Sequence, residues 1–241
     1  MQRSPSFLMR FLRPRNYLLF FLWRLKLAQI VIHSTKLKIK FRNASEKSLF
    51  LDCGSNIGQG FEFFRRYYPL DRFDFVLFEP NPHCFKVLEQ KYSDLSSRGV
   101  MLLNAAVGTQ VGEIDFYGLD DTQGGIYSVG GSILPEHNSG IYTSPNNSSL
   151  KVISINFTDY LRDLMNEKDY SRIVLKLDIE GGEYQILDSL MENQMLKLFD
   201  TIYVEFHSQY MSNEKAKEYS NRERRFLQYA RGSRIRVIKW I

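Results

Sequence analysis

Short apolar segments alternate with segments of helical periodicity in the first half of this chain, and this alternation limits the folds that it can adopt. Residues 48–52 and 74–79 are apolar runs, and helical patterns over 61–68 and 84–92 follow them. A third apolar run lies at 100–104. Strands that alternate with helices form parallel sheets that are covered by helices on both faces. We therefore expect an α/β fold with a doubly wound, mostly parallel, Rossmann-like sheet.

The second half continues this pattern after one interruption. Residues 111–117 alternate apolar and polar side chains, which is typical of an antiparallel strand. Residues 118–149 are rich in glycine, serine, asparagine and aspartate, so we expect a lid or acceptor loop there. Periodicity predicts the remaining elements: strands at 151–155, 172–178, 201–207 and 235–240, and helices at 158–166 (capped by Thr158), 183–191 and 214–229.

The charge is distributed unevenly along the 241 residues, which suffice for one domain with a sizeable core. Residues 1–46 carry ten basic and one acidic side chain, whereas 47–213 carry 13 basic and 23 acidic ones. We place a basic, aromatic-rich helical arm at 1–46 and the folded domain at 47–241. The acidic middle of the chain argues against a nucleic-acid partner. Two cysteines form no disulfide framework, so we expect a cytoplasmic protein.

The N-terminal arm raises the question of membrane contact. Its apolar run at 17–23 is followed by Arg24 and Lys26, so it is shorter than the roughly 20 apolar residues of a membrane span. Two arrangements remain open for the arm. It forms either a helix packed on the domain or a peripheral helix that contacts anionic lipid through residues 10–32.

Polar residues follow each predicted parallel strand. They are Asp52, Glu79, Asn104, Asp178 with Glu180, and Glu205 with His207. Ligands of open α/β sheets bind at the carboxyl ends of the strands, so we expect these side chains to meet in one site. Asp52 can accept a hydrogen bond from a charged amine, and Gly54 and Gly58 allow close approach of a ligand. Glu79 stands where a carboxylate binds the hydroxyls of a ribose, which indicates an adenosine-type cofactor.

Five motifs extend this pattern, at residues 51–58, 78–82, 104–108, 175–183 and 204–207. With them the chain resembles the FkbM-type S-adenosylmethionine-dependent methyltransferases. The resemblance implies a class I methyltransferase fold, S-adenosylmethionine as cofactor, and methylation of a hydroxyl on a sugar, glycan or natural-product-like acceptor. The cofactor-binding residues that it implies are Asp52, Gly54, Asn56, Gly58, Glu79, Asn104 and Ala105. The arm lies outside the resemblance, and one strand follows His207 where such sheets usually have two.

Methylation of a hydroxyl requires that the acceptor lose its proton, so a base at the site helps. His207 is the candidate, because an unperturbed imidazole has a pKa near 6.5. Asp178 or Glu205 would orient His207 or act as the base directly, and a carboxylate base would titrate several units lower. Asp178, Glu180, Glu205 and His207 are also donors that a divalent cation accepts, but they show no fixed ligand spacing, so we predict no metal.

Two further residues, Lys176 and Glu183, belong to the expected site. Lys176 shares a strand face with Asp178, so we expect it to be the buried partner of an acid. Glu183 begins a helix, where the helix dipole favours a carboxylate.

Two alternative functions remain open: a nicotinamide-dependent oxidoreductase and a non-catalytic cofactor-binding subunit at a membrane. The chain lacks the Gly-x-Gly-x-x-Gly spacing of dinucleotide sites, which argues against the oxidoreductase.

Overall fold

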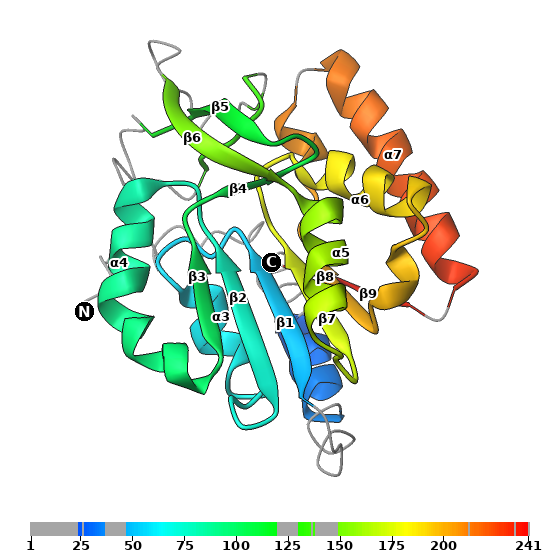
Figure 1. Cartoon of the computed structure of the whole chain (residues 1–241). Coiled ribbons are helices and arrows are strands. Elements are labelled where there is room, and N and C mark those ends of the chain that lie inside the picture. The colour runs from blue at the N-terminus through cyan, green and yellow to red at the C-terminus, as the bar shows by residue number, and fades with distance from the viewer. Residues whose placement is uncertain are drawn as a thin grey trace.

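The computed structural model describes residues 24–25, 27–36, 47–119, 130–135, 137, 149–211, 213–233 and 235–240. Six strands form the main sheet in the order β3-β2-β1-β7-β8-β9, and all their pairings are parallel (Figure 1). The strands are β1 Ser48–Cys53, β2 Phe73–Phe78, β3 Val100–Leu103, β7 Ile173–Leu177, β8 Thr201–Val204 and β9 Arg236–Lys239. The predicted doubly wound α/β sheet is confirmed.

The strand order reverses between β1 and β7. From β1 the chain adds β2 and β3 on one side of the sheet, and later adds β7, β8 and β9 on the other side. Asp52 and Lys176 are direct register partners across this junction. A crevice opens outside the carboxyl ends of the strands at such a reversal, which makes this the expected place for a ligand.

Helices cover both faces of the main sheet. They are α3 Gln59–Phe64, α4 Pro82–Tyr92, α5 Phe157–Glu167, α6 Glu183–Glu192 and α7 Asn213–Arg231. Because successive strand side chains point to opposite faces, Leu49 and Leu51 share a core with α5, α6 and α7, whereas Phe50 packs with α3 and α4. Figure 1 shows α3 behind the sheet and α5 in front of it.

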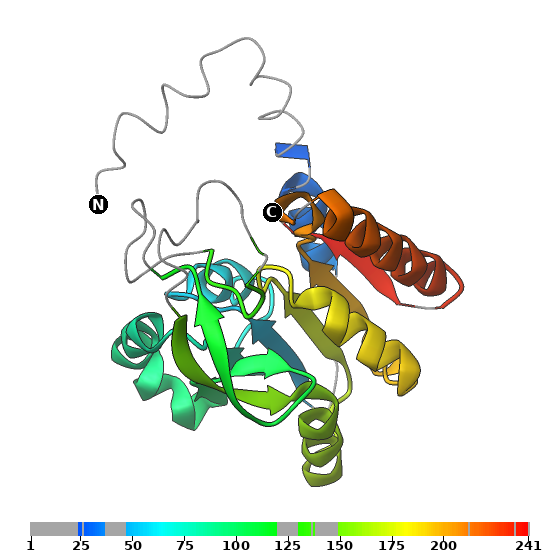
Figure 2. The ribbon, with the colours of Figure 1, turned by 90° about the horizontal axis from the view of Figure 1, so that it is seen from above.

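A second, three-stranded sheet lies at the carboxyl end of the main one. It contains β4 Ala106–Gly108, β5 Gly112–Tyr117 and β6 Ser149–Asn156 in the order β4-β6-β5. β5 pairs with β6 in antiparallel fashion, as the alternation at 111–117 predicts. β4 begins shortly after β3 ends, so the small sheet lies over the strand ends, as the view from above shows (Figure 2).

Two local predictions were wrong. The helix expected at 61–68 ends at Phe64, and the amides of Tyr67 and Tyr68 both donate to the Phe64 carbonyl in a tight turn. The cap of α5 is Asn156, whose side chain accepts hydrogen bonds from the amides of Thr158 and Asp159. Thr158 itself donates its hydroxyl to Asn156, so it lies within the helix.

The described part of the N-terminal arm is helical and packs on the domain. Ile30 is buried in the core of the α3 face. His33 Nε2 lies 3.2 Å from Thr201 Oγ1, and Ser34 Oγ lies 2.9 Å from the Tyr203 hydroxyl, so the helix of residues 27–36 contacts β8. These contacts are those of a packed helix.

Membrane contact through residues 10–32 stays a prediction, because residues 10–23 lie outside the described part. In the described segments no helix combines the length and the apolar character needed to cross a bilayer. Most of the expected lid at 118–149 also falls outside the described residues, although 130–135 and His137 belong to it.

Candidate active site

A cavity of about 350 Å³ opens at the carboxyl ends of the main strands, below the small sheet. Phe116 of β5 and Gly131 and Ile133 of the loop before β6 close its other side. Most of the predicted site residues line this cavity, namely Gly54, Asn56, Glu79, Ala105, Asp178, Glu180, Glu205 and His207. The structure therefore joins residues from five strand ends in one site.

Three predicted cofactor residues do not line the cavity. Asp52 is fully buried, and its carboxylate faces Lys176. Asn104 donates from Nδ2 to the carbonyl oxygens of Glu79 and Pro80, at 2.8 and 3.2 Å, so it braces the loop after β2. Gly58 precedes α3 in a left-handed conformation. These residues support the walls of the site, and their direct contact with a cofactor stays a prediction.

Gly54 allows the turn after β1 to lie against the end of β7. Its φ is +82°, and a Cβ at this position would lie 1.8 Å from the carbonyl oxygen of Asp178. The Asp178 amide also donates to the Cys53 carbonyl. A side chain at position 54 would therefore push apart the two strand ends that form the floor of the cavity.

Lys176 is buried among acceptors at the junction of β1 and β7. Its Nζ lies 3.0 Å from Asp52 Oδ1 and 3.5 Å from Asp178 Oδ2, and it donates to the Gly54 carbonyl at 2.9 Å. Burial alone would lower the pKa of Lys176, but the carboxylates of Asp52 and Asp178 raise it above its ordinary value. The expected pairing of Lys176 with an acid is confirmed.

Glu79 presents a preformed carboxylate at the end of β2. Its Oε2 accepts from the Asn56 amide at 2.7 Å, and its Oε1 accepts from the Asn81 amide at 2.9 Å. Burial raises the pKa of Glu79 to about 7. A carboxylate has about four acceptor positions, so both oxygens retain capacity for a ligand's hydroxyls.

Glu183 fixes the ring of His207, a role that the sequence analysis missed. Glu183 Oε1 accepts hydrogen bonds from the His207 amide and contacts ring Nδ1, both at 2.9 Å. Its Oε2 accepts from the Gly181 amide at 2.8 Å. The sequence analysis explained Glu183 by its place at the start of a helix. Its contact with His207 became visible only in the structure, where α6 begins beside the end of β8.

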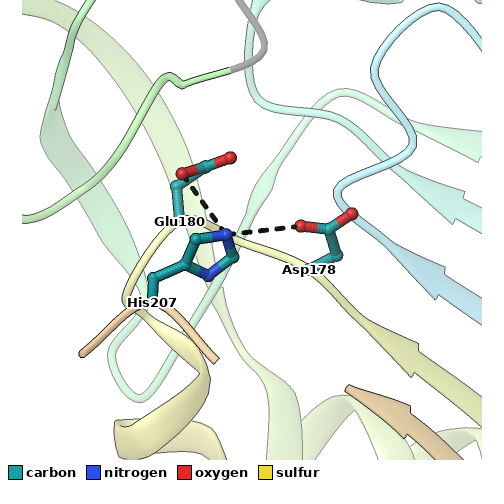
Figure 3. Close-up of side chains that lie close together, drawn as sticks. All are labelled: Asp178, Glu180 and His207. Atoms are coloured by element: carbon teal, nitrogen blue, oxygen red, sulfur yellow. Dashed lines mark ion pairs between the residues drawn. The ribbon is translucent and has the colours of Figure 1, made fainter. Parts of the chain in front are cut away.

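The second ring nitrogen of His207 faces three more carboxylates. Nε2 lies 3.5 Å from Glu180 Oε2 and 3.9 Å from both Asp178 Oδ1 and Glu205 Oε1 (Figure 3 shows the first two). Burial opposes the charge, but the acidic neighbours, Glu183 first among them, raise the pKa of His207 to about 10. The assumption of an unperturbed pKa near 6.5 is therefore wrong for this histidine.

Glu180 also contacts His137, which comes from the segment before β6. Glu180 has a φ of +53°, a left-handed conformation that is uncommon outside glycine and concentrates at functional sites. Its Oε2 lies 3.1 Å from His137 Nε2, and its carbonyl accepts from Ser132 Oγ at 2.6 Å. His137 lies in the segment that was predicted only as a lid, so no spacing in the sequence pointed to it.

Glu205 is the most accessible of the carboxylates around His207. Its side chain is 31% exposed, whereas that of Asp178 is 21% exposed and that of Glu180 is 15% exposed. Burial and the nearby charge of Asp178 raise the pKa of Glu205 to about 7. The expectation that a Glu205 base would titrate several units below a histidine of ordinary pKa is therefore wrong.

Comparison with known proteins gives one family. The model of the methyltransferase FkbM domain matches residues 52–235, a range that contains every predicted site residue. No curated protein matches the chain. The crystal structure of a methyltransferase FkbM from Methylobacillus flagellatus KT is similar at 15% sequence identity and a TM-score of 0.42. The similarity covers 74% of this chain and 36% of that one, so this chain spans well under two thirds of the length of that protein.

The match to the family model covers most of the chain and all of the predicted site residues. The chain therefore belongs to the FkbM methyltransferase family.

Proposed function

We propose that this protein is an S-adenosylmethionine-dependent O-methyltransferase that acts on a hydroxyl of a sugar, glycan or small natural-product-like acceptor. The observation that carries the proposal is one cavity with two chemically distinct ends. Glu79, held by two backbone amides, follows β2, and His207 follows β8 on the other side of the β1–β7 junction, so the two lie toward opposite ends of the cavity. Family membership supports methyl transfer as the reaction.

The Glu79 end suits the nucleoside part of the cofactor. The carboxylate is oriented before any ligand arrives, because the Asn56 and Asn81 amides hold both its oxygens. Ala105 and Pro80 line the wall beside it with small surfaces against which a flat base can pack. The cavity volume lies in the usual range for small-molecule sites. When bound, the cofactor would supply an electrophilic methyl group to this cavity.

The opposite end suits an acceptor hydroxyl. A neutral hydroxyl is a weak nucleophile, and a carboxylate placed beside it can take its proton as the oxygen attacks the methyl carbon. We assign this role to Glu205, which lines the cavity and is the most accessible acid there. His207 is less suitable, because its side chain is only 2% exposed and Glu183 contacts its Nδ1 at 2.9 Å.

Two measurements test this function. Calorimetric titration of the full chain should give saturable binding of S-adenosylmethionine and S-adenosylhomocysteine and no comparable binding of NAD. Transfer of a labelled methyl group to a panel of sugars, glycans and phenolic or polyketide alcohols should then identify the acceptor class. Tight NAD binding without S-adenosylmethionine binding would support the oxidoreductase alternative. Cofactor binding with no transfer to any acceptor would favour the non-catalytic subunit.

A further inference from the structure

Asp178, Glu180 and His207 form a compact set of donor atoms that the proposed transfer does not require. One oxygen from each acid and one ring nitrogen lie within 4.8 Å of one another (Figure 3). The two acids come from the turn after β7 and the histidine from the turn after β8. His207 Nε2 lies 3.5 Å from Glu180 Oε2 and 3.9 Å from Asp178 Oδ1, and these separations suit ligands of one ion, since metal–ligand distances of about 2.0 to 2.3 Å place neighbouring ligands about 3 to 4 Å apart.

A second imidazole, that of His137, lies beside Glu180 and comes from a separate segment. The His137 side chain is 1% exposed, and its Nε2 lies 3.1 Å from Glu180 Oε2. Among the described residues this nitrogen has no hydrogen-bond partner, because the contact with Glu180 lacks hydrogen-bond geometry. A buried imidazole nitrogen without a hydrogen bond is costly, and a ligand at this position would satisfy it.

His207 is held in the manner of a metal-binding histidine. Ligating histidines almost always donate their other ring N–H to a carboxylate or carbonyl, which fixes the tautomer and the ring orientation. Glu183 contacts His207 Nδ1 at 2.9 Å and is itself fixed by the Gly181 amide. This leaves Nε2 directed toward Asp178 and Glu180.

The local charge also favours a cation. The carboxylates of Asp178, Glu180 and Glu205 all lie within 4 Å of His207 Nε2. Lys176 contacts Asp178 through Oδ2 at 3.5 Å, and it also contacts Asp52 and the Gly54 carbonyl. Acids packed this closely repel one another unless a positive charge, either a protonated His207 ring or a bound cation, lies between them.

We propose that Asp178, Glu180 and His207, with His137 as a fourth ligand, bind a divalent first-row transition-metal ion of the Mn²⁺ or Zn²⁺ type. Two imidazoles with two carboxylates favour such an ion over Mg²⁺ or Ca²⁺, which prefer oxygen ligands alone. This binding goes beyond the proposed function and does not depend on it. One consequence does rest on that function: an ion here would lie beside Glu205 and polarise an acceptor hydroxyl, so that the hydroxyl loses its proton more readily.

Direct metal binding tests the site without any methyl transfer. Tag-free full-length protein is dialysed against a chelator and titrated with Mn²⁺, followed by electron paramagnetic resonance, and with Zn²⁺, followed by calorimetry. We expect one saturable site, with Mg²⁺ and Ca²⁺ at least tenfold weaker. Asp178→Asn, Glu180→Gln and His207→Gln should each weaken binding at least tenfold, and His137→Gln and Glu183→Gln should weaken it by about tenfold.

His83→Gln and Glu113→Gln are the matched controls, because both side chains are exposed and neither lines the cavity, and they should leave affinity unchanged. The melting temperature of each variant shows whether it folds, and the His137 variant provides the test if a strand-end variant does not. Absence of saturable binding of both ions, unchanged affinity in the folded site variants, or equal affinity for Mg²⁺ would overturn the proposal. Metal binding in a protein that transfers no methyl group would contradict only the proposed function. Methyl transfer without metal binding would contradict only this inference.

Discussion

Lys176 Nζ lies 3.0 Å from Asp52 Oδ1, and both side chains are buried at the point where the strand order of the main sheet reverses. The two residues are register partners on β1 and β7, so the ion pair joins the two halves of the sheet. Lys176 also donates to the Gly54 carbonyl in the turn that lines the cavity. The pair therefore couples the stability of the sheet to the shape of the site.

Removal of one partner of this pair should be much more harmful than removal of both. Lys176→Met leaves the Asp52 carboxylate buried without its cation, and the free energy of unfolding should fall by about 3–5 kcal/mol. The double variant Lys176→Met/Asp52→Asn should recover much of this loss. Urea unfolding followed by circular dichroism measures both effects. A single variant as stable as the double variant would show that the ion pair does not carry this energy.

Glu79→Ala should weaken S-adenosylmethionine binding. The variant removes charged hydrogen-bond acceptors for the ribose, each of which contributes about 1.5–3 kcal/mol at most, so affinity should fall at least tenfold. Glu89→Ala, an exposed acid on α4, is the control and should bind as the unchanged protein does. Calorimetry of both variants measures the difference. Unchanged affinity in Glu79→Ala would remove the nucleoside subsite from this end of the cavity.

Glu205→Gln should separate turnover from binding. Glutamine keeps the size of the side chain but cannot take a proton, so we expect kcat to fall by roughly 10²–10⁴ while S-adenosylmethionine affinity changes less than threefold. Glu113→Gln, on the exposed side of β5, is the matched control. If Glu205→Gln keeps turnover within a fewfold, Glu205 is not the base, and the role returns to His207 or Asp178, the other candidates from the sequence.

The packing of His33 should make stability fall in mild acid. Burial, and then the charges of Arg236 and Lys36, lower the pKa of His33 from its ordinary 6.5 to about 4. Between these values the unfolded chain binds a proton that the folded protein does not, so the contribution of His33 to stability is lost as pH falls from about 6.5 toward 4.

The matched variant for this pH effect is His33→Gln, which keeps a side chain able to bond with Thr201. The other histidines contribute equally to both proteins, so the difference in unfolding free energy between them isolates His33. As pH drops from 7 to 4.5, the unfolding free energy of the unchanged protein should fall relative to that of His33→Gln. A difference independent of pH would mean that the helix of residues 27–36 does not hold His33 in its buried position.

The sequence by itself determined the strands, their parallel arrangement and the polar residues at their ends. These features are local: a run such as 48–52 is apolar because both faces of its strand are covered, and Asp52 and Asp178 follow such runs. The motifs of the family are local as well, which is why the resemblance could be stated before any coordinates. Local pattern was insufficient for the end of α3, where two backbone amides share the Phe64 carbonyl, and for the cap of α5, where the Asn156 side chain accepts from two amides.

The tertiary structure alone decided which side chains meet. Asp52 contacts Lys176 because β1 and β7 are neighbours, and Glu183 holds His207 because α6 packs beside the end of β8. His137 joins the cluster from a segment without regular periodicity. Periodicity records which face of an element a residue occupies, but partners separated by more than a hundred positions are set by strand order and register. For the same reason the pKa of His207 could not be read from the chain, since its four acidic neighbours come together only in the folded protein.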